Sequence, residues 1–355
     1  MNRTYSTNKI CLVGAFDFIN KPTGGQPVKS RELYFALSEK YGKSNITFVD
    51  TYWWKKKPIS MLRKLNKKAL EADILIMLPA HNGVVVFSFL LNYYKRIHGK
   101  KIFYDVIGGW LAEKTNNSNV LRQRIKNFDG IWVETTSMKE ALIEQGFNNV
   151  DVVPNFKNIK CLNQDELTIH FEKPFKVCTF SRVNEQKGIV DAIKAVKQIN
   201  STMGEQVLTL DIYGQIDADF EVKFQNLLAE NNQVVNYLGI VSPDDSVNVL
   251  RNYYLLLFPT RYFTEGIPGT LIDAYASGVP VISSYWKNSL DIFKNHVTGL
   301  GFEFGNYEAF YKTLKHAVEN EKEIIEMKFK CIVESKRYTR ETVIEEIDRL
   351  LMSTI

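Results

Sequence analysis

The chain has 355 residues, of which 45% are hydrophobic and 24% are charged, and its formal net charge is +5. The length favours two domains over one, and the composition excludes intrinsic disorder and a disulfide-stabilised scaffold. A net charge of this size is too small to predict nucleic-acid binding.

Short apolar runs alternate with helical patterns through the first half of the chain. The apolar runs, each a predicted strand, cover residues 9–16, 46–52, 73–80, 101–109, 130–136 and 150–154. This β/α alternation is typical of a parallel sheet covered by helices. Pro154 and Asn155 then indicate a turn into a linker that extends to about Lys173.

The second half repeats the pattern. Predicted strands cover residues 175–183, 207–214, 234–239, 254–260 and 279–284, with helices between them and closing helices at 307–319 and 340–352. We therefore predict an α/β protein with two Rossmann-like domains, residues 1–165 and 166–335, that face each other across a cleft. Residues 336–355 are predicted to be a C-terminal helix that packs back towards the first domain. Ligands of such sheets bind at the carboxyl ends of strands, so we expect the functional residues there.

Residues 53–68 form a basic segment. They contain seven Lys or Arg, two Trp and no acidic residue. One interpretation is a solvated helix face. The other is a docking patch for an anionic membrane surface, with Trp at the interface and Lys at the lipid phosphates.

The loop and helix within residues 258–284 are the most informative stretch. Glu265 follows a predicted strand, and Pro268 is suited to the first turn of the helix that comes next. The free backbone N–H groups of Gly269 and Thr270 predict an anion site, such as one for a phosphate, at the helix start. Asp273 lies eight positions after Glu265, and two such carboxylates can accept hydrogen bonds from hydroxyls on either side of a diphosphate. An ordinary strand-to-helix turn with a solvated acid is the alternative.

This stretch resembles the E-x7-E motif of retaining glycosyltransferase family 4, which belongs to the glycosyl transferases group 1, has the GT-B fold and includes polysaccharide-biosynthesis enzymes. The resemblance implies that Glu265 faces the donor sugar and that Asp273, one methylene shorter than the usual Glu, faces the ribose. It assigns donor binding to the residues around the helix start, namely Gly266, Ile267, Pro268, Gly269 and Thr270.

Residues 180–196 are similar to the family segment that clamps the donor diphosphate. Arg182 and Lys187 match its two cations, Gly188 opens the helix, and Ser181 replaces the usual Gly. Two cations beside a helix N-terminus can stabilise a leaving diphosphate as its charge develops. The resemblance therefore implies catalytic roles for Arg182, Lys187 and Glu265, and no metal or cofactor. Without it, such cations are usually ordinary surface charges.

Glycines and one histidine complete the predicted site. Gly24 and Gly25 match the family's first βα loop, where a backbone without side chains can approach a phosphate, and Gly214 is a further candidate for donor approach. Many relatives carry a His where this chain has Gly108 and Gly109. His81, at the end of an earlier strand, and Gly109 are the candidates on the acceptor side.

Three other motifs bear on rival functions. Asp217 and Asp219 read as D-x-D, a manganese clasp of another glycosyltransferase fold, but they lie in the second domain, where the GT-B fold has no such clasp. Neither G-x-G-x-x-G at a first helix nor G-x-x-x-x-G-K-[ST] is present, which argues against a dehydrogenase and a P-loop enzyme.

The expected cellular location follows from the cysteines and the chain start. The four cysteines are scattered and form no C-x-x-C pair, so we expect reduced, mostly buried thiols. Residues 1–8 lead directly into a strand, and no apolar stretch is long enough for a signal peptide or a membrane span. We expect a cytoplasmic protein, with peripheral attachment to the inner face of the plasma membrane if residues 53–68 bind lipid.

The resemblance thus implies a retaining, metal-independent glycosyltransferase of the hexosyltransferase type. Its donor is a nucleotide diphosphate sugar, by family frequency a UDP-sugar, and its acceptor is a saccharide or lipid-linked saccharide in cell-surface polysaccharide biosynthesis. A sugar-nucleotide epimerase of the same fold and a catalytically silent carbohydrate or membrane-surface binding protein are the alternatives.

Overall fold

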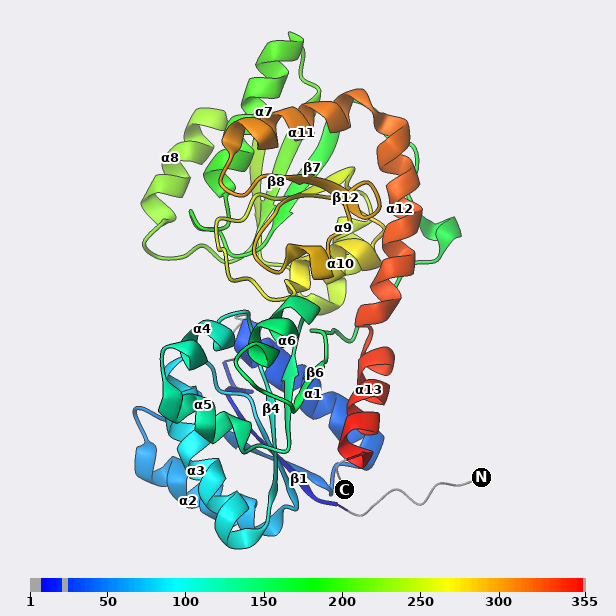
Figure 1. Ribbon diagram of the computed structural model, residues 1–355. Helices are drawn as coiled ribbons and strands as arrows, with labels where there is room; N and C mark the ends of the chain where they lie inside the picture. Colours follow the sequence, from blue (N-terminus) through cyan, green and yellow to red (C-terminus); the bar gives the residue numbers. More distant parts are fainter. Residues whose placement is uncertain (1–7, 21–24, 354–355) are drawn as a thin grey trace. The chain divides into compact units, whose positions relative to one another are not determined.

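The structure is a computed structural model that describes residues 8–20 and 25–353 (Figure 1). It divides into two compact units. The first comprises the described residues up to Asn158 together with the segment from Arg340, and the second comprises Ile159–Thr339.

The first unit is built on six parallel strands in the order β2-β1-β3-β4-β5-β6. Their bounds are β1 Ile10–Gly14, β2 Ile46–Asp50, β3 Ile74–Met77, β4 Lys101–Asp105, β5 Gly130–Val133 and β6 Val150–Val152. Every residue of β1, β3 and β5 is buried. Continuous apolar runs of this kind occur where helices cover both faces of a parallel sheet.

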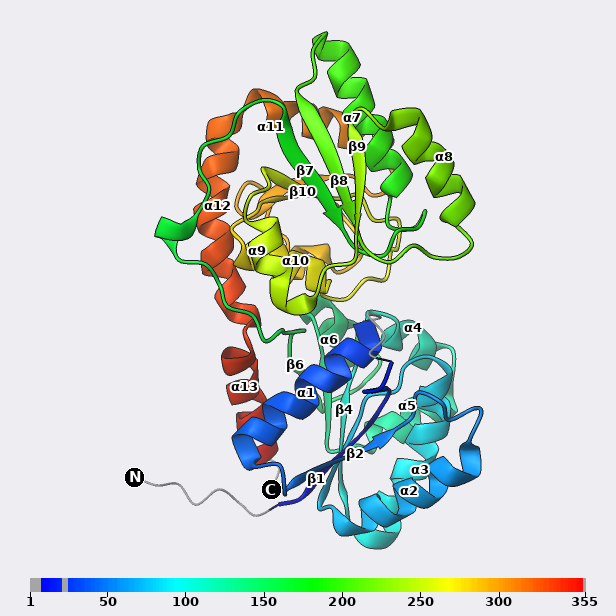
Figure 2. The ribbon, with the colours of Figure 1, turned by 180° about the vertical axis from the view of Figure 1, so that it is seen from behind.

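Helices cover the two faces of this first sheet. Apolar residues of α1 (Gly25–Tyr41) and α13 (Arg340–Met352) pack on one face. The other face packs against α2 (Pro58–Glu71), α3 (Asn82–His98), α4 (Leu111–Asn116), α5 (Asn119–Lys126) and α6 (Thr136–Ile143). Figures 1 and 2 show α1 and α3 on opposite sides of the sheet.

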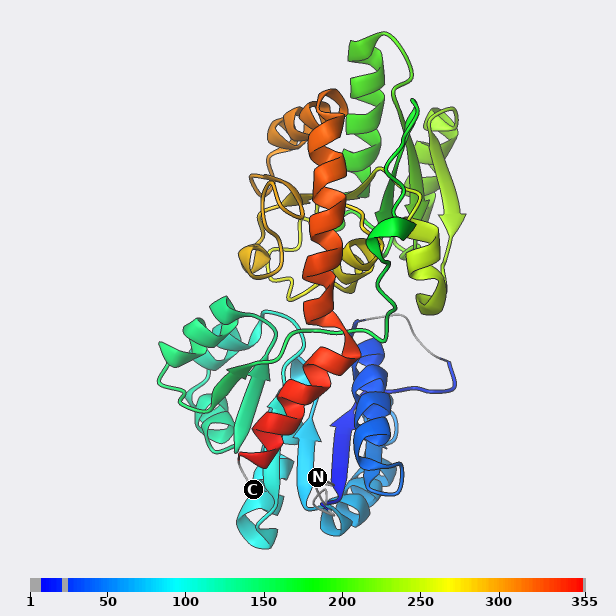
Figure 3. The ribbon, with the colours of Figure 1, turned by 90° about the vertical axis from the view of Figure 1, so that its right-hand side faces the viewer.

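The last helix joins the first unit although it follows the second in sequence. Figure 3 shows α13 beside α1. Arg340 Nη2 lies 3.1 Å from Glu32 Oε2, and the Tyr41 hydroxyl donates to Asp348 over 2.5 Å. These polar contacts flank the apolar packing and hold α13 on α1.

The second unit also has six parallel strands, in the order β12-β11-β10-β7-β8-β9. Its strands are β7 Phe175–Phe180, β8 Leu208–Tyr213, β9 Val235–Gly239, β10 Leu255–Phe258, β11 Val281–Ser284 and β12 Gly299–Phe302. Its α-helices are α7 Ile189–Met203, α8 Glu221–Asn231, α9 Ser246–Leu250, α10 Gly269–Ala276, α11 Tyr307–Glu319 and α12 Glu321–Ser335.

The two sheets confirm the predicted α/β class, and each predicted strand is present. The sequence analysis missed strand β12 and helices α4, α5 and α12. Strand β12 reads as a loop because it contains Gly299 and Gly301. Gly299 is required there, since a Cβ at this position would lie 1.9 Å from the carbonyl oxygen of Val281 on the neighbouring strand.

All four cysteines are free thiols, and Cys11, Cys178 and Cys331 are buried. Within residues 8–20 and 25–353, no helix is both long and apolar enough to span a bilayer.

Candidate functional site

The strand order of the second sheet reverses between β7 and β10. The chain runs outward from β7 through β8 to β9, and then returns to place β10 on the other side of β7. Loops that leave the carboxyl ends of two strands at such a switch point diverge and leave room for a ligand. Arg182 and Lys187 follow β7, and Glu265 follows β10, so the topology brings these residues together.

Glycines let the loops at this edge pack closely. A Cβ on Gly188 would lie 2.0 Å from the carbonyl oxygen of Pro259, and one on Gly214 would lie 1.8 Å from that of Ser181. Both glycines have positive φ, +72° and +133°. Only glycine fits these positions without displacing a neighbouring backbone.

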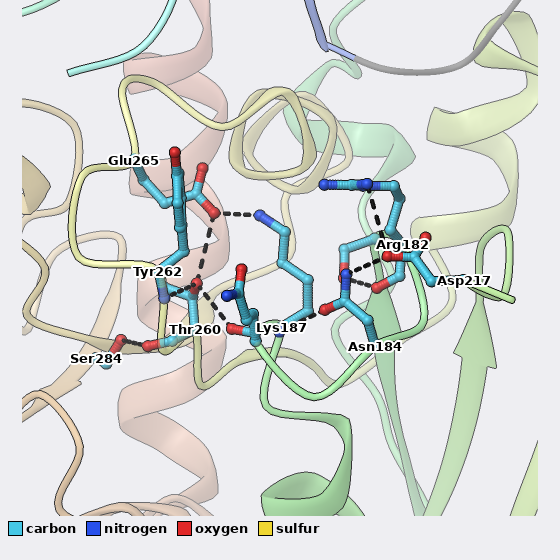
Figure 4. A network of polar contacts seen from close by, with 10 residues as sticks. Arg182, Asn184, Lys187, Asp217, Thr260, Tyr262, Glu265 and Ser284 are labelled. Carbon is cyan, nitrogen blue, oxygen red and sulfur yellow. Dashed lines mark hydrogen bonds and ion pairs between the residues drawn. The ribbon is translucent and has the colours of Figure 1, made fainter. Parts of the chain in front are cut away.

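Lys187 and Glu265 form an ion pair at the centre of the cluster. The ammonium bonds Glu265 Oε1, to which the Thr260 hydroxyl also donates over 3.4 Å. The side chains are 17% and 13% exposed, and Lys187 Nζ lies 5.6 Å from the ring centre of Phe258. Figure 4 shows Lys187 and Glu265 pointing towards each other from separate loops. The pair is largely shielded from water and electrostatically stronger than a surface pair.

Arg182 is held differently. Its Nη1 lies 3.6 Å from Asp217 Oδ2, and its side chain is 57% exposed. Asn184 donates to the same Asp217 oxygen over 2.8 Å and accepts a hydrogen bond from the backbone N–H of Lys187 over 2.9 Å. Figure 4 shows this chain of contacts from Arg182 to Lys187. Asn184 therefore couples the loop after β7, which carries both cations, to Asp217 in the loop after β8.

The sequence analysis missed Asn184 and Thr260 and considered Asp217 only as a metal ligand. The spacing N-x-x-K, in which an Asn side chain caps the backbone three residues later, is a signal for Asn184. No local signal identifies Thr260, because its role depends on the position of Glu265. In the described part of the chain, no group of three or more His, Cys, Asp or Glu is arranged to hold a metal ion.

Further contacts brace the loop that carries Glu265. Arg261 makes two hydrogen bonds to the Asp191 carboxylate, at 2.8 and 2.9 Å. The Asn288 side chain donates to the backbone oxygen of Glu265 over 2.7 Å. These contacts fix the loop to α7 and to the segment after β11, so Glu265 is presented on a supported backbone.

Helix α10 begins beside this loop. Its cap is Pro268, its first residue is Gly269, and no acidic residue lies in its first turn. Gly266 and Ile267 are buried just before it. Thr270 Oγ1 is buried and has no hydrogen-bond partner within the described residues. An unsatisfied hydroxyl beside free N–H groups at a helix N-terminus can accommodate an anion.

Asp273 lies in the second turn of α10. Its side chain is 3% exposed, and Oδ1 accepts a hydrogen bond from the Ser246 hydroxyl over 2.9 Å. The carboxylate thus contacts the first residue of α9. A ribose contact by Asp273 stays a prediction, and Ser246 is a residue that the sequence analysis did not include.

The candidates of the first unit lie at the carboxyl ends of its strands. His81 caps α3 with φ of +49°, and its ring stacks on Trp110 with centroids 5.0 Å apart. Gly109, which is buried, immediately precedes Trp110. Gly25 is the exposed first residue of α1, and Gly24 lies outside the described residues. Burial lowers the pKa of His81, and the nearby Lys114 lowers it further, which favours the neutral imidazole.

The first unit also contains a buried charge cluster at the carboxyl ends of β4 and β5. Lys29 Nζ, on α1, lies 2.8 Å from Asp105 Oδ1 and 3.2 Å from Glu134 Oε1, and all three side chains are at most 3% exposed. Lys29 also donates to the backbone oxygen of Val106 over 3.4 Å. The cluster ties α1 to the ends of β4 and β5, and the sequence analysis did not include it.

Comparison with known proteins decides the family. Residues 163–335 match the family model described as "Glycosyl transferases group 1". The second unit belongs to the group 1 glycosyltransferases. The match contains Arg182, Lys187 and Glu265, so the loop cluster described above lies within the glycosyltransferase domain.

Individual relatives agree with this family. The chain is 21% identical over 278 residues to the amylovoran biosynthesis glycosyltransferase AmsK of Erwinia amylovora, covering 73% of this chain and 65% of AmsK. It is 31% identical over 155 residues to the UDP-N-acetylglucosamine–peptide N-acetylglucosaminyltransferase GtfA subunit of Streptococcus pneumoniae, covering 42% of this chain and 29% of that subunit. The chain therefore matches just under two thirds of the first relative and less than a third of the second.

The similarity of fold to solved structures extends over both units. HepE of Anabaena, solved in complex with UDP-glucose, aligns with a TM-score of 0.75 and 16% identity over 98% of this chain and 100% of HepE. Such similarity shows a common fold. The predicted GT-B architecture is confirmed, and the two parallel sheets described above are its two Rossmann-like halves.

Proposed function

We propose that this chain is a retaining hexosyltransferase that moves a sugar from a UDP-sugar to a saccharide or lipid-linked saccharide acceptor. The observation that carries the proposal is the cluster of Arg182, Lys187 and Glu265 at the switch point of the glycosyltransferase domain, beside the start of α10. Two cations and a helix N-terminus suit a diphosphate. The UDP-glucose complex of HepE supports UDP as the carrier.

Charge balance predicts how the donor enters. Lys187 is paired with Glu265, and Arg182 contacts Asp217, so the four side chains have no formal net charge together. A diphosphate would compete with these carboxylates for both cations. Once Lys187 turns to phosphate, the Glu265 carboxylate is released to accept hydrogen bonds from the donor sugar.

The reaction proposed for this site needs no protein nucleophile. The bond between the anomeric carbon and the diphosphate oxygen breaks, and the acceptor oxygen bonds the same face of that carbon. The acceptor proton passes to an oxygen of the leaving diphosphate. Arg182 and Lys187 stabilise the charge that develops on that group, so neither a metal nor a cofactor is part of the proposal.

We propose that the first unit binds the acceptor, with His81 and Gly109 near it. A neutral imidazole, which the lowered pKa favours, can both donate and accept hydrogen bonds with hydroxyls. The names of a capsular polysaccharide biosynthesis glycosyltransferase, CapH of Staphylococcus aureus, and of AmsK support an acceptor in cell-surface polysaccharide biosynthesis. We further propose a cytoplasmic enzyme whose residues 53–68 contact the anionic inner face of the plasma membrane.

The proposal is tested by incubating the purified protein with a panel of nucleotide sugars and saccharide acceptors. We expect release of UDP together with a glycosylated product, at a rate that neither EDTA nor Mn²⁺ changes. Replacing Arg182 or Lys187 by Ala should lower turnover by about 10²–10³-fold, the loss typical for removal of a transition-state charge partner. Lys197→Ala, an exposed change on α7, is the control.

Three results would contradict the proposal. Near-normal rates in both variants would exclude the assigned roles of the cations. Conversion of the donor sugar without any acceptor would identify an epimerase. Tight binding of a nucleotide sugar with no release of nucleotide under any acceptor would identify a silent binding protein.

A further inference from the structure

Three neighbouring helices of the first unit form one outward surface, which we call the α2–α3–α5 face. The Tyr94 hydroxyl on α3 donates to Asn66 on α2 over 3.1 Å. Asn92 on α3 donates to the backbone oxygen of Arg124 on α5 over 2.9 Å. All three helices bury their inner residues in the same core, so their outer residues share a surface.

The charge of this face is almost wholly positive. It has nine Lys or Arg, four in α2, two in α3 and three in α5, and one acidic residue, Glu71. The helices on the opposite side of the sheet differ: α1 and α13 together have five Lys or Arg and six Asp or Glu. Lys95 is paired with Asp129 at 2.7 Å. The unit is therefore electrostatically two-sided, with its positive side on α2, α3 and α5.

The same face exposes large apolar side chains. Four of them, each four residues after the last, form a stripe along α3: Val85, Phe89, Tyr93 and Ile97, between 42% and 61% exposed. Ile59 and Leu62 on α2 and Val120 on α5 are also exposed. A helix of a protein in water normally turns such residues inward. A group of exposed apolar side chains of this size indicates a surface that contacts a membrane or another molecule.

Aromatic rings and cations are interleaved on this side. Arg124 lies 5.2 Å from the ring centre of Phe89. In the segment before α2, Lys56 Nζ lies 4.6 Å from the ring centre of Trp53, which is exposed and packs edge-on against Tyr52. Apolar and aromatic side chains that alternate with Lys and Arg match the interface of an anionic bilayer.

Other occupants fit this surface less well. A second copy of the face would bring two strongly positive surfaces together, and like charges oppose such association. A nucleic acid would use the cations but leave the aliphatic stripe of α3 in water. The pairing of positive charge with exposed apolar residues therefore favours lipid.

We infer that the α2–α3–α5 face docks on an anionic membrane surface, with Lys and Arg at the lipid phosphates and the α3 stripe inserted among the headgroups. The contact proposed for residues 53–68 is then one edge of a surface three helices wide. The inference deepens the proposed function by placing a lipid-linked acceptor beside the unit that would bind it. The docking itself requires no turnover, so it can be tested separately.

The test is co-sedimentation of the full chain with vesicles of phosphatidylcholine, with and without about one third phosphatidylglycerol. We expect the chain to bind the anionic vesicles at least about tenfold more strongly than the neutral ones. Salt should weaken this binding, because screening acts on exposed charges. The variant R63E/K64E/K67E should lower anionic-vesicle binding at least about tenfold. The variant F89S/I97S, which keeps the charge, should weaken the binding that remains at high salt.

A matched control changes the charge by the same amount elsewhere. Lys312, Lys322 and Lys330 are exposed on α11 and α12 of the second unit, and K312E/K322E/K330E should leave vesicle binding unchanged. Each variant is checked for folding by its thermal unfolding. Equal binding to neutral and anionic vesicles, or equal losses in control and test variants, would overturn the inference. So would a wild-type dimer in sedimentation velocity that the α3 variant dissociates.

Discussion

The Lys187 ammonium is bonded to the Glu265 carboxylate although 78 positions separate the two residues in sequence. The pair contains one residue assigned to the phosphates and one assigned to the sugar. In the proposed function, a donor therefore exchanges partners with both side chains.

Replacing the carboxylate of this pair should separate binding from turnover. In Glu265→Gln the amide holds Lys187 less strongly than the carboxylate does, so we expect UDP to bind several-fold tighter, by about 1 kcal/mol, while sugar transfer becomes slower. Isothermal titration with UDP and a transfer assay measure the two effects. Glu185→Gln, which removes an exposed carboxylate paired with Lys223, should change neither. Weaker UDP binding in Glu265→Gln would contradict the exchange of partners.

Two glycines of similar backbone conformation should differ in their tolerance of a methyl group. Gly188 and Gly204 have φ of +72° and +70°, but only at Gly188 would a Cβ meet another backbone atom. Gly204→Ala should cost about 1 kcal/mol of unfolding free energy through left-handed strain. Gly188→Ala should cost about 3 kcal/mol or more, because overpacking is added, and should abolish UDP binding. Urea unfolding of both variants compares them, and equal costs would rule out the close loop packing.

The buried hydroxyl of Thr270 offers a test of the anion site that does not disturb the fold. Because Oγ1 has no partner within the described residues, Thr270→Val should leave the unfolding free energy within about 0.5 kcal/mol of the wild type. If a phosphate oxygen accepts a hydrogen bond from this hydroxyl, the UDP affinity of Thr270→Val should be about tenfold lower than that of the wild type. This is the effect of losing one hydrogen bond to a charged group. Thr313→Val, on α11, is the control for affinity. Unchanged UDP affinity in Thr270→Val would remove this hydroxyl from the site.

The buried cluster of the first unit should make stability depend on pH when its cation is removed. Burial alone lowers the pKa of Lys29, but Asp105 and Glu134 raise it above the usual value, and the pKa of Asp105 is raised chiefly by burial. Lys29→Met leaves two buried carboxyl groups without their cation and should cost about 3–5 kcal/mol at neutral pH. Without Lys29 the pKa of the Asp105 carboxyl rises further above the unfolded value, because the cation that lowers it is gone.

The sign of that pH effect is fixed by proton uptake. A carboxyl whose folded pKa is raised binds more protons in the folded state than in the unfolded state, so stability increases as pH falls. The deficit of Lys29→Met should therefore shrink between pH 7 and pH 5, as followed by urea unfolding. The triple variant K29M/D105N/E134Q removes the charges and should lose this dependence. A deficit that grows on acidification would contradict the assignment.

Local sequence patterns were sufficient to predict the fold class and to single out the loops after β7 and β10. Apolar runs separated by helical patterns predicted each strand they covered, since burial on both faces of a parallel sheet requires continuous apolar residues. The same patterns did not predict β12, because Gly299 and Gly301 are typical of a loop. Only the close approach of Val281 on the neighbouring strand explains why position 299 is a glycine. The resemblance to group 1 glycosyltransferases carried by residues 180–196 and 258–284 was confirmed by the family match over residues 163–335, and the assignment to family 4 within that group stays a prediction.

By itself, then, the sequence determined the two α/β halves, the family and the loops after β7 and β10. Only the tertiary structure decided which side chains meet: Lys187 with Glu265, Asn184 with Asp217, Asp273 with Ser246, and Lys29 with its two carboxylates. The reason is physical. Periodicity and turn residues act within a few positions of the chain, whereas partners between loops depend on strand order and on which helices cover which face of a sheet, and these are settled by packing of the whole unit.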